Sequence, residues 1–258
     1  MPPDVDDLGR QVVVPPRVER VVSLVPSLTE SVAVTAPGLL VGATDWCSHP
    51  PDLVVTRVSG TKSPDVGAVV GLRPDVVLAN AEENRESDLD ALRAAGVTVW
   101  VTAPTTVPGA LESLDRMLRL ACRLDRPQWL DDAEHAWRRP YSGPRRRALV
   151  PIWRRPWMAL GRDTFAGDVL ERLGVDNVLA DDADRYPKID LALVRDEGVD
   201  LVVLPDEPYA FTDAEGVEVF GDWQVPVVHV SWRDLTWYGP SLGPARSRLA
   251  AVLAASLP

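Results

Sequence analysis

The sequence predicts an α/β protein made of two similar lobes, each a parallel sheet flanked by helices, with a long helix joining them. Short apolar runs of strand length alternate with helical segments along the chain, which is typical of parallel sheets. The same order of strands then begins again near Ala148, after a long helical stretch. Repetition of this kind indicates topology more strongly than any single motif.

The first lobe begins with the stretch RVVSLVPSLTESVAV at residues 20–34. Val21, Val22 and Leu24 predict a buried strand, and Pro26 predicts a turn into a helix. Ser27 followed by Glu30 predicts a capping box at the start of that helix. A strand that runs into a helix places unpaired N–H groups at the carboxyl edge of a sheet, where open α/β sheets bind ligands.

Three apolar runs of the first half have counterparts in the second half at an offset of about 127 residues. The matched pairs are Val21–Ser27 with Ala148–Trp153, Pro74–Leu78 with Val199–Pro205, and Val97–Thr102 with Val225–Val230. Three further elements complete the first lobe: a strand over 39–43, and helices over about 65–72 and 87–95. We therefore predict two tandem lobes of the same topology.

The segment between the lobes is helical by pattern. Leu111, Leu114, Leu118 and Ala121 recur at spacings of three and four, which is typical of an amphipathic helix. Pro127 breaks the pattern, so the segment is either a kinked helix or two helices in succession. The predicted domains are an N-terminal α/β lobe at 1–105, a linking backbone helix at 106–139 and a C-terminal α/β lobe at 140–258.

Composition excludes several classes of function. The chain has 258 residues and a net charge of −11, which argues against nucleic acid and anionic membrane surfaces as partners. No apolar run reaches the length of about 18 residues that a membrane helix needs. The N-terminus is acidic and has no signal-peptide pattern, so the chain as written is expected in the cytoplasm, or in the periplasm if a leader has been removed. Cys47 and Cys122 suggest no disulfide framework, although one bridge stays open.

Aromatic side chains follow the predicted strands. Trp46 follows the second strand, Trp153 and Trp157 follow the first strand of the second lobe, and Trp237 follows its last strand. Tyr186 lies in a polar connector. Because the carboxyl ends of parallel strands share one edge, we expect these rings at one cleft, where they suit a large, flat, partly apolar ligand.

The order and spacing of several short motifs resemble those of the cobalamin- and siderophore-binding solute receptors of ABC transporters, the helical-backbone metal receptor family. The resemblance covers nearly the whole chain. It rests on DLGR at 7–10, VVSLVPSLTE at 21–30, the stretch 42–51 ending in Pro50-Pro51, LRPDVVL at 72–78, LGRDT at 160–164, Asn177-Val178 and 199–204. It implies two Rossmann-like lobes of the class III periplasmic-binding-protein fold, a monomer, and a corrinoid such as cobalamin bound between the lobes.

The vitamin B12 receptors give the most similar pattern, and they imply a set of ligand-binding residues. Trp46, Trp157 and Tyr186 match aromatic pocket positions, Ser27 matches a small residue at the pocket floor, and Asn80 matches a position that is aromatic in those receptors. Asp234 and Trp237 match the last pocket loop. Receptors of this family dock on a permease through a glutamate on each lobe, whereas the first-lobe position is Gly67 here; Glu218 or Asp222 are the second-lobe candidates.

The sequence also offers candidates for metal binding and for catalysis. His49 and His229 are candidates for a metal site across the cleft, but three or four ligands are usual, so no protein metal site is predicted and His229 is kept only as a candidate axial ligand. His229, Ser231 and Asp234 are a conceivable catalytic set, but nothing supplies an oxyanion hole, so no enzyme is predicted. The alternative functions are a ferric siderophore or haem binder, or an enzyme of metal-cofactor metabolism on the same fold.

Overall fold

The computed structural model describes residues 4–255, and its chain divides into two compact units. Unit 1 comprises Met1–Pro104, Pro108–Asp132 and Tyr238–Pro240. Unit 2 comprises Thr105–Val107, Ala133–Trp237 and Ser241–Pro258. Across residues 4–255, no helix combines the length and the apolar character needed to cross a membrane.

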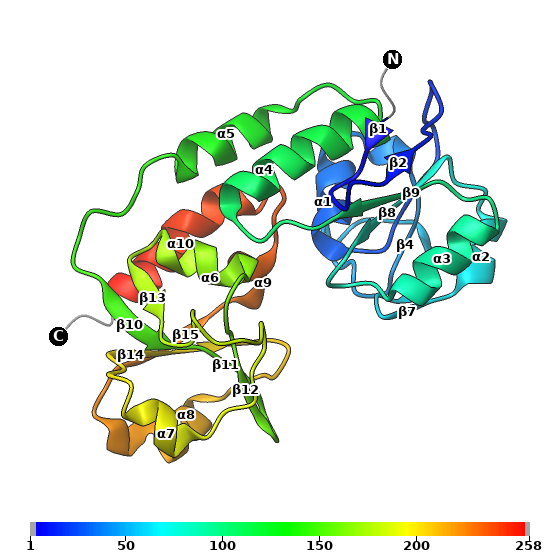
Figure 1. Ribbon diagram of the computed structural model, residues 1–258. Coiled ribbons are helices and arrows are strands. Elements are labelled where there is room, and N and C mark those ends of the chain that lie inside the picture. Colours follow the sequence, from blue (N-terminus) through cyan, green and yellow to red (C-terminus); the bar gives the residue numbers. More distant parts are fainter. Residues whose placement is uncertain (1–3, 256–258) are drawn as a thin grey trace. The chain divides into compact units, whose positions relative to one another are not determined.

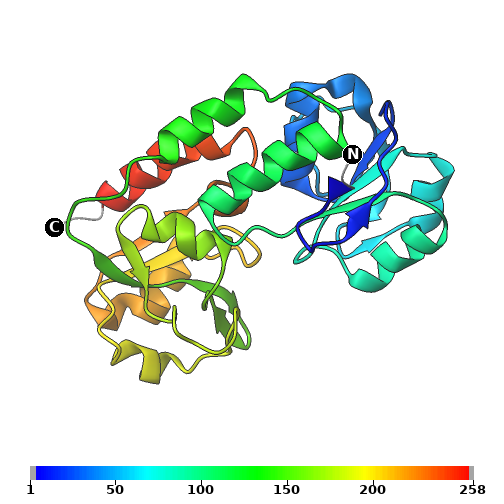
Figure 2. The same ribbon diagram turned by 45° about the horizontal axis from the view of Figure 1, so that its top comes forward.

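Unit 1 is built on a parallel five-stranded sheet (Figure 1). Its strands are, in spatial order, β5 (Thr56–Arg57), β4 (Leu40–Ala43), β3 (Val21–Ser23), β8 (Val76–Asn80) and β9 (Val99–Thr102). Helices α2 (Val66–Gly71) and α3 (Glu86–Ala94) lie side by side, and α1 (Pro26–Thr35) lies on the other side of the strands (Figures 1 and 2). The predicted strands and helices of this half are confirmed within a few residues at each end.

The buried side chains explain why these segments pair. Every residue of β8 is buried, as expected for a strand covered on both faces. The core between the sheet and α2 and α3 is formed by apolar side chains, with Val22, Val77, Leu89, Leu92 and Val101 among them. Two short hairpins complete the unit: β1 (Asp4–Val5) with β2 (Gln11–Val12), and β6 (Ser59–Gly60) with β7 (Ser63–Pro64).

Unit 2 repeats the plan with a parallel four-stranded sheet. Its strands are, in spatial order, β13 (Val175–Asn177), β10 (Arg146–Leu149), β14 (Leu201–Pro205) and β15 (Val227–Val230). Figure 1 shows α7 (Leu191–Arg195) and α8 (Asp213–Phe220) on one face of this sheet. The other face carries α6 (Phe165–Glu171), α9 (Trp232–Thr236) and α10 (Leu242–Ala255). The order β13-β10-β14-β15 corresponds to β4-β3-β8-β9 of unit 1, so the predicted duplication is confirmed.

One element of unit 2 has no counterpart in unit 1. The predicted strand over 148–153 is interrupted at Val150, and the chain continues as an antiparallel hairpin of β11 (Pro151–Arg154) and β12 (Trp157–Ala159). The hairpin begins where β10 ends, so it stands at the carboxyl edge of the unit 2 sheet. Its position matters because it carries Trp153 and Trp157.

The segment predicted as one backbone helix at 106–139 contains two helices. The first is α4 (Val107–Arg116), extended by a π-helical turn over Met117–Ala121, and the second is α5 (Gln128–Trp137). Arg123 adopts a left-handed backbone with a φ of 56°, and Pro127 has no N–H to continue a helix. The alternative of two successive helices therefore describes this segment.

The predicted capping box at the start of α1 is wrong. The N-cap residue is Val25, which makes no side-chain capping bond, and Pro26 is the first helical residue. Ser27 and Glu30 lie inside the helix and are buried. Proline suits the first helical position because the N–H that it lacks would have no partner within the helix there. The Ser27 side chain therefore does not cap the helix and can bond elsewhere.

Candidate functional site

The buried hydroxyl of Tyr238 is the centre of a polar cluster at the carboxyl edge of the unit 1 sheet. The Asn80 amide nitrogen donates to this hydroxyl at 2.7 Å, and Thr102 Oγ1 lies 3.0 Å from it. The Ser27 side chain also hydrogen-bonds to Tyr238. Burial raises the pKa of Tyr238 above its ordinary value of 10.0, against the effect of these hydrogen bonds, so the phenol is neutral. Two residues predicted to face a ligand, Ser27 and Asn80, thus hold Tyr238.

The other side of the Asn80 amide fixes the loop that follows β8. Its Oδ1 accepts from the backbone N–H groups of Glu82 at 2.8 Å and Glu83 at 3.1 Å. In the same loop, Asn84 Nδ2 donates to the Thr61 carbonyl at 2.9 Å, and Lys62 Nζ donates to the Glu82 carbonyl. The donors and the acceptor of Asn80 are therefore used within unit 1, and they make this edge rigid.

Trp46 lies in the loop after β4 and is displayed to solvent, with 69% of its surface exposed. Its neighbour Cys47 is fully buried, and Cys47 Sγ lies 3.0 Å from Thr29 Oγ1 and 3.1 Å from Thr44 Oγ1. Val54, in the same loop, is 94% exposed. The buried contacts of Cys47 thus anchor the base of this loop, while the Trp46 ring is exposed to solvent at the carboxyl edge of unit 1.

In unit 2, Trp157 is a packing residue as well as an edge residue. Its ring stacks on Phe211 at 6.0 Å with an interplanar angle of 4°, and it meets Phe220 edge-on. Arg154 lies 5.9 Å from the Trp157 ring centroid. Trp157 is half-buried, which leaves part of the ring for another contact.

The Tyr186 connector runs beside Trp157. Pro187 O accepts from Ala159 N at 3.1 Å, and Ile189 N donates to Trp157 O at 3.1 Å. The Arg185 guanidinium lies 5.9 Å from the Tyr186 ring. The structure therefore brings together the Trp157 and Tyr186 segments within unit 2.

The last predicted pocket segment is α9 with its C-terminal end. Asp234 is buried and accepts two hydrogen bonds from Arg248 on α10, at 2.7 and 2.5 Å. The guanidinium of Arg233 lies 5.1 Å from the ring of Trp237. The Asp234 carboxylate thus joins α9 to α10, while Trp237 remains half-buried at the end of α9.

His229 faces helix α8. Its Nε2 lies 3.2 Å from Asp213 Oδ1, at the first turn of α8, and it lines a small pocket of about 310 Å³ with Gly216 and Phe220. Within residues 4–255, no group of three or more His, Cys, Asp or Glu side chains is arranged to hold a metal ion. Asp234 and His229 also each have a different partner, so the conceivable Ser–His–Asp set is not assembled.

A second network fixes the loop between β14 and α8. Arg154 donates to Glu215 at 2.5 Å and to Glu218 at 2.9 Å, and the Tyr209 hydroxyl donates to Glu215 at 2.6 Å. Hydrogen bonds from Tyr209, from the Thr212 backbone and from Arg154 lower the pKa of Glu215 to about 2. Thr212 and Glu215 also form the capping box of α8.

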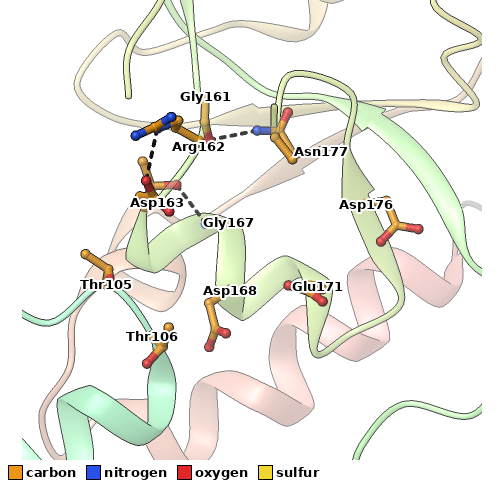
Figure 3. A pocket seen from close by; sticks show the side chains of 12 residues that line it. Thr105, Thr106, Gly161, Arg162, Asp163, Gly167, Asp168, Glu171, Asp176 and Asn177 are labelled. Atoms are coloured by element: carbon orange, nitrogen blue, oxygen red, sulfur yellow. Dashed lines mark hydrogen bonds and ion pairs between the residues drawn. The ribbon is translucent and has the colours of Figure 1, made fainter. Parts of the chain in front are cut away.

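Unit 2 contains a polar pocket of about 370 Å³ that none of the predicted residues lines (Figure 3). Figure 3 shows Thr105 and Thr106 on one side and Asp168 and Glu171 of α6 on the other, with Asn177 beyond. Three of its four acidic side chains form ion pairs: Asp163 with Arg162, Asp168 with Arg172, and Asp176 with Arg145. These ion pairs neutralise most of the negative charge of the pocket.

Sequence reasoning did not single out two residues that the structure brings forward. Tyr238 was one aromatic among several, because nothing local shows that it is buried beside residues 80 and 102. The resemblance pointed to Trp157 and not to Trp153, yet Trp153 is the more exposed, at 40%. Alternation on β11 was the available signal, since successive side chains of a strand point to opposite faces.

Comparison with known proteins agrees with this architecture. The chain is 26% identical over 180 residues to the vitamin B12-binding protein of Salmonella typhi, and the match spans 66% of each protein, just under two thirds of the relative's length. Two solved structures superpose on about nine tenths of the chain: the periplasmic vitamin B12 binding protein BtuF of Vibrio cholerae and the periplasmic haem-binding protein RhuT of Roseiflexus sp. RS-1.

The BtuF structure has a TM-score of 0.72 at 19% identity and covers 93% of this chain and 98% of its own. The RhuT structure has a TM-score of 0.71 at 19% identity and covers 93% of this chain and 99% of its own. At these identities the likeness concerns the fold, which is the predicted one. The sequence profile of the periplasmic binding proteins matches residues 21–207, and the chain belongs to that family.

Proposed function

We propose that this protein binds a corrinoid, such as cobalamin, through aromatic side chains at the carboxyl edges of its two sheets. The observation that carries the proposal is Trp46, whose ring is 69% exposed on a loop with a buried, hydrogen-bonded base. Large aromatic rings are seldom left in water without a partner, and a rigid ring binds a flat ligand at little entropic cost. Half-buried Trp157, Tyr186 and Trp237 extend the aromatic character to unit 2.

The charge of the edges supports a corrinoid over an anionic ferric siderophore or haem. Two arginines of unit 2, Arg154 in the hairpin and Arg162, are each paired with carboxylates. A siderophore or a haem propionate needs unpaired cationic groups, whereas the amide side chains of a corrinoid need hydrogen-bond acceptors. The similarity to both B12-binding and haem-binding proteins keeps haem as the second candidate.

We propose a binding role without catalysis. His229 faces Asp213 and the carboxylate of Asp234 is held by Arg248, which supports this view. The bound corrinoid would supply its own equatorial metal ligands, so the protein needs to offer only ring contacts and hydrogen bonds. An axial contact from His229 would require the ring to leave Asp213.

We also propose that the protein acts as a monomer of two lobes, at 1–105 and 140–258, linked by 106–139. A permease that docks through a first-lobe glutamate would find Gly67, in the first turn of α2, where the nearest side-chain atom to an added Cβ is Asp65 Oδ1. Glu218, a second-lobe candidate, is paired with Arg154. Light scattering of the purified protein tests the monomer, and a stable dimer would contradict it.

Titration with four ligands tests the function. Hydroxocobalamin, cyanocobalamin, haem and a ferric siderophore are added in turn while visible absorbance and tryptophan fluorescence are followed. We expect saturable quenching by the corrinoids, and a loss of affinity of about tenfold or more in Trp46→Ala with unchanged stability. Trp129→Phe is the control, because Trp129 is held by Thr35 in unit 1, at 2.9 Å, away from the edge loops. No response to either corrinoid at tens of micromolar would refute the proposal.

A further inference from the structure

Trp153 and Tyr209, called here the edge pair, meet at the carboxyl edge of the unit 2 sheet. Trp153 lies on β11, directly after β10, and Tyr209 lies in the loop after β14, the strand next to β10. Their ring centroids are 5.8 Å apart at an interplanar angle of 78°, which is an edge-to-face contact. Two neighbouring strands therefore place two aromatic rings at the same point of the edge.

Hydrogen bonds and ring contacts with neighbouring side chains hold the edge pair in place. The Tyr209 hydroxyl donates to Glu215 at 2.6 Å, and Glu215 is fixed in turn by Arg154 and by the cap of α8. The Tyr209 ring packs on Phe211 at 4.7 Å, and Phe211 stacks on Trp157. Trp153 Nε1 donates to Arg155 O at 3.2 Å. A surface fixed in this way loses little side-chain entropy when it binds a ligand.

Trp153 is more exposed than Trp157, its neighbour on the hairpin. The Trp157 ring packs against Phe211 and Phe220, and so contributes to the core cluster of unit 2. Trp153 is 40% exposed, and its ring meets Tyr209 edge-on. An exposed tryptophan against a half-buried tyrosine, at the edge where α/β sheets bind ligands, has the properties of a binding hot spot.

The charges around the edge pair indicate the chemistry of the ligand. The hairpin and the β14–α8 segment carry two basic groups, Arg154 and Arg155, and five acidic ones: Asp206, Glu207, Asp213, Glu215 and Glu218. Arg154 is neutralised by two of these carboxylates. Asp206 and Glu207 are exposed in the Tyr209 loop. Carboxylates accept hydrogen bonds from amides and repel anions.

We infer that Trp153 and Tyr209 are the principal aromatic contacts of unit 2 for the ligand, and that they suit an uncharged, amide-bearing metal chelate better than an anionic one. The inference rests on the proposed function and deepens it. Trp157 supports the edge pair through Phe211, so it acts as a packing residue more than as a ligand contact. The resemblance implied Trp157 as the aromatic contact of unit 2. The residue inferred here is Trp153, four residues earlier on the hairpin.

Cyanocobalamin titrations of four proteins test this inference: wild type, Trp153→Ala, Tyr209→Ala and Tyr141→Ala. Tyr141 is the matched control, since it is also 40% exposed in unit 2 but precedes β10, at the opposite end of that strand. We expect a rise in Kd of about tenfold or more for Trp153→Ala and Tyr209→Ala, and less than twofold for Tyr141→Ala. Urea unfolding of each variant accompanies the titrations, and Trp153→Phe, which keeps a ring, should restore most of the affinity.

Acrylamide quenching gives a second readout. Bound cyanocobalamin should reduce the accessible tryptophan fluorescence of wild type by a larger amount than that of Trp153→Phe. Wild-type binding with unchanged Kd in both Trp153→Ala and Tyr209→Ala would overturn the edge pair while leaving the proposed function intact. Tighter binding of an anionic ferric siderophore than of cyanocobalamin would overturn the ligand class. A wild type that binds no corrinoid would refute the proposed function itself.

Discussion

Asn80 and Tyr238 are 158 residues apart in the sequence, and the Asn80 amide donates a 2.7 Å hydrogen bond to the Tyr238 hydroxyl. Tyr238 belongs to unit 1, whereas Trp237 before it and Ser241 after the three-residue segment belong to unit 2. Gly239 allows this segment to approach α1, because an added Cβ would lie 2.9 Å from Ser27 O and 3.0 Å from Ser31 Oγ. Ser27 and Asn80, which the resemblance assigned to a ligand, therefore hold a segment that lies far along the chain.

The hydroxyl of Tyr238 is expected to contribute to stability. Tyr238→Phe keeps the ring but leaves the buried amide of Asn80 and hydroxyl of Thr102 without their shared partner. We expect a loss of about 1–3 kcal/mol in the free energy of unfolding, measured with urea. Tyr141→Phe, at an exposed ring, should change stability by less than about 0.5 kcal/mol. Equal stability of Tyr238→Phe and wild type would show that this cluster is not important for the fold.

Glu215 should make the stability of unit 2 sensitive to acid. Its pKa is about 2 in the folded protein, below the ordinary 4.5, chiefly because Tyr209 donates to it. The stabilisation is therefore complete above the ordinary pKa and is lost as the pH falls from about 4.5 towards 2. Urea midpoints at several pH values should fall less steeply in this window for Glu215→Gln than for wild type. Glu112→Gln, an exposed glutamate on α4, should follow wild type; the same slope in all three proteins would contradict the prediction.

Gly161 is expected to tolerate no side chain. An added Cβ would overlap the Asp184 carbonyl oxygen and lie 2.9 Å from Pro187 Cδ, in the connector that leads to Tyr186. Gly161→Ala should therefore displace this connector and destabilise the protein by about 1–3 kcal/mol, with weaker ligand binding as a consequence. Gly71→Ala is the control, because an added Cβ there meets nothing within 4 Å. Thermal unfolding measures both, and equal melting temperatures would argue against this packing.

Both cysteines should resist thiol reagents in the native state. Cys47 and Cys122 are free and buried. Burial raises the pKa of Cys122 to about 12 and also raises that of Cys47, where hydrogen bonds from Thr29 and Thr44 act in the opposite direction. Since the thiolate is the reactive form, Ellman's reagent at about pH 8 should label neither residue until denaturant is added. Rapid labelling of one equivalent in the native protein would contradict the buried placement.

Much of the fold could be predicted because the signal is local. The apolar runs at Val76–Asn80 and Leu201–Pro205 are buried on both faces, and such runs are typical of parallel strands. The break between α4 and α5 does not follow from sequence alone, since Pro127 is equally compatible with a kink. The start of α1 was mispredicted because Pro26 can begin a helix without the side-chain cap that Ser27 suggested.

The sequence by itself determined the two-lobe α/β plan, the duplicated strand order and the edges at which aromatic rings gather, since hydrophobic period and repetition are properties of neighbouring residues. Only the tertiary structure decided how each edge side chain is used. Trp46 and Trp153 remain exposed, whereas Ser27 and Asn80 hold Tyr238, and Asp234 holds Arg248. The physical reason is that a buried polar group needs a partner, and partners that are distant in the sequence are chosen by packing, not by pattern.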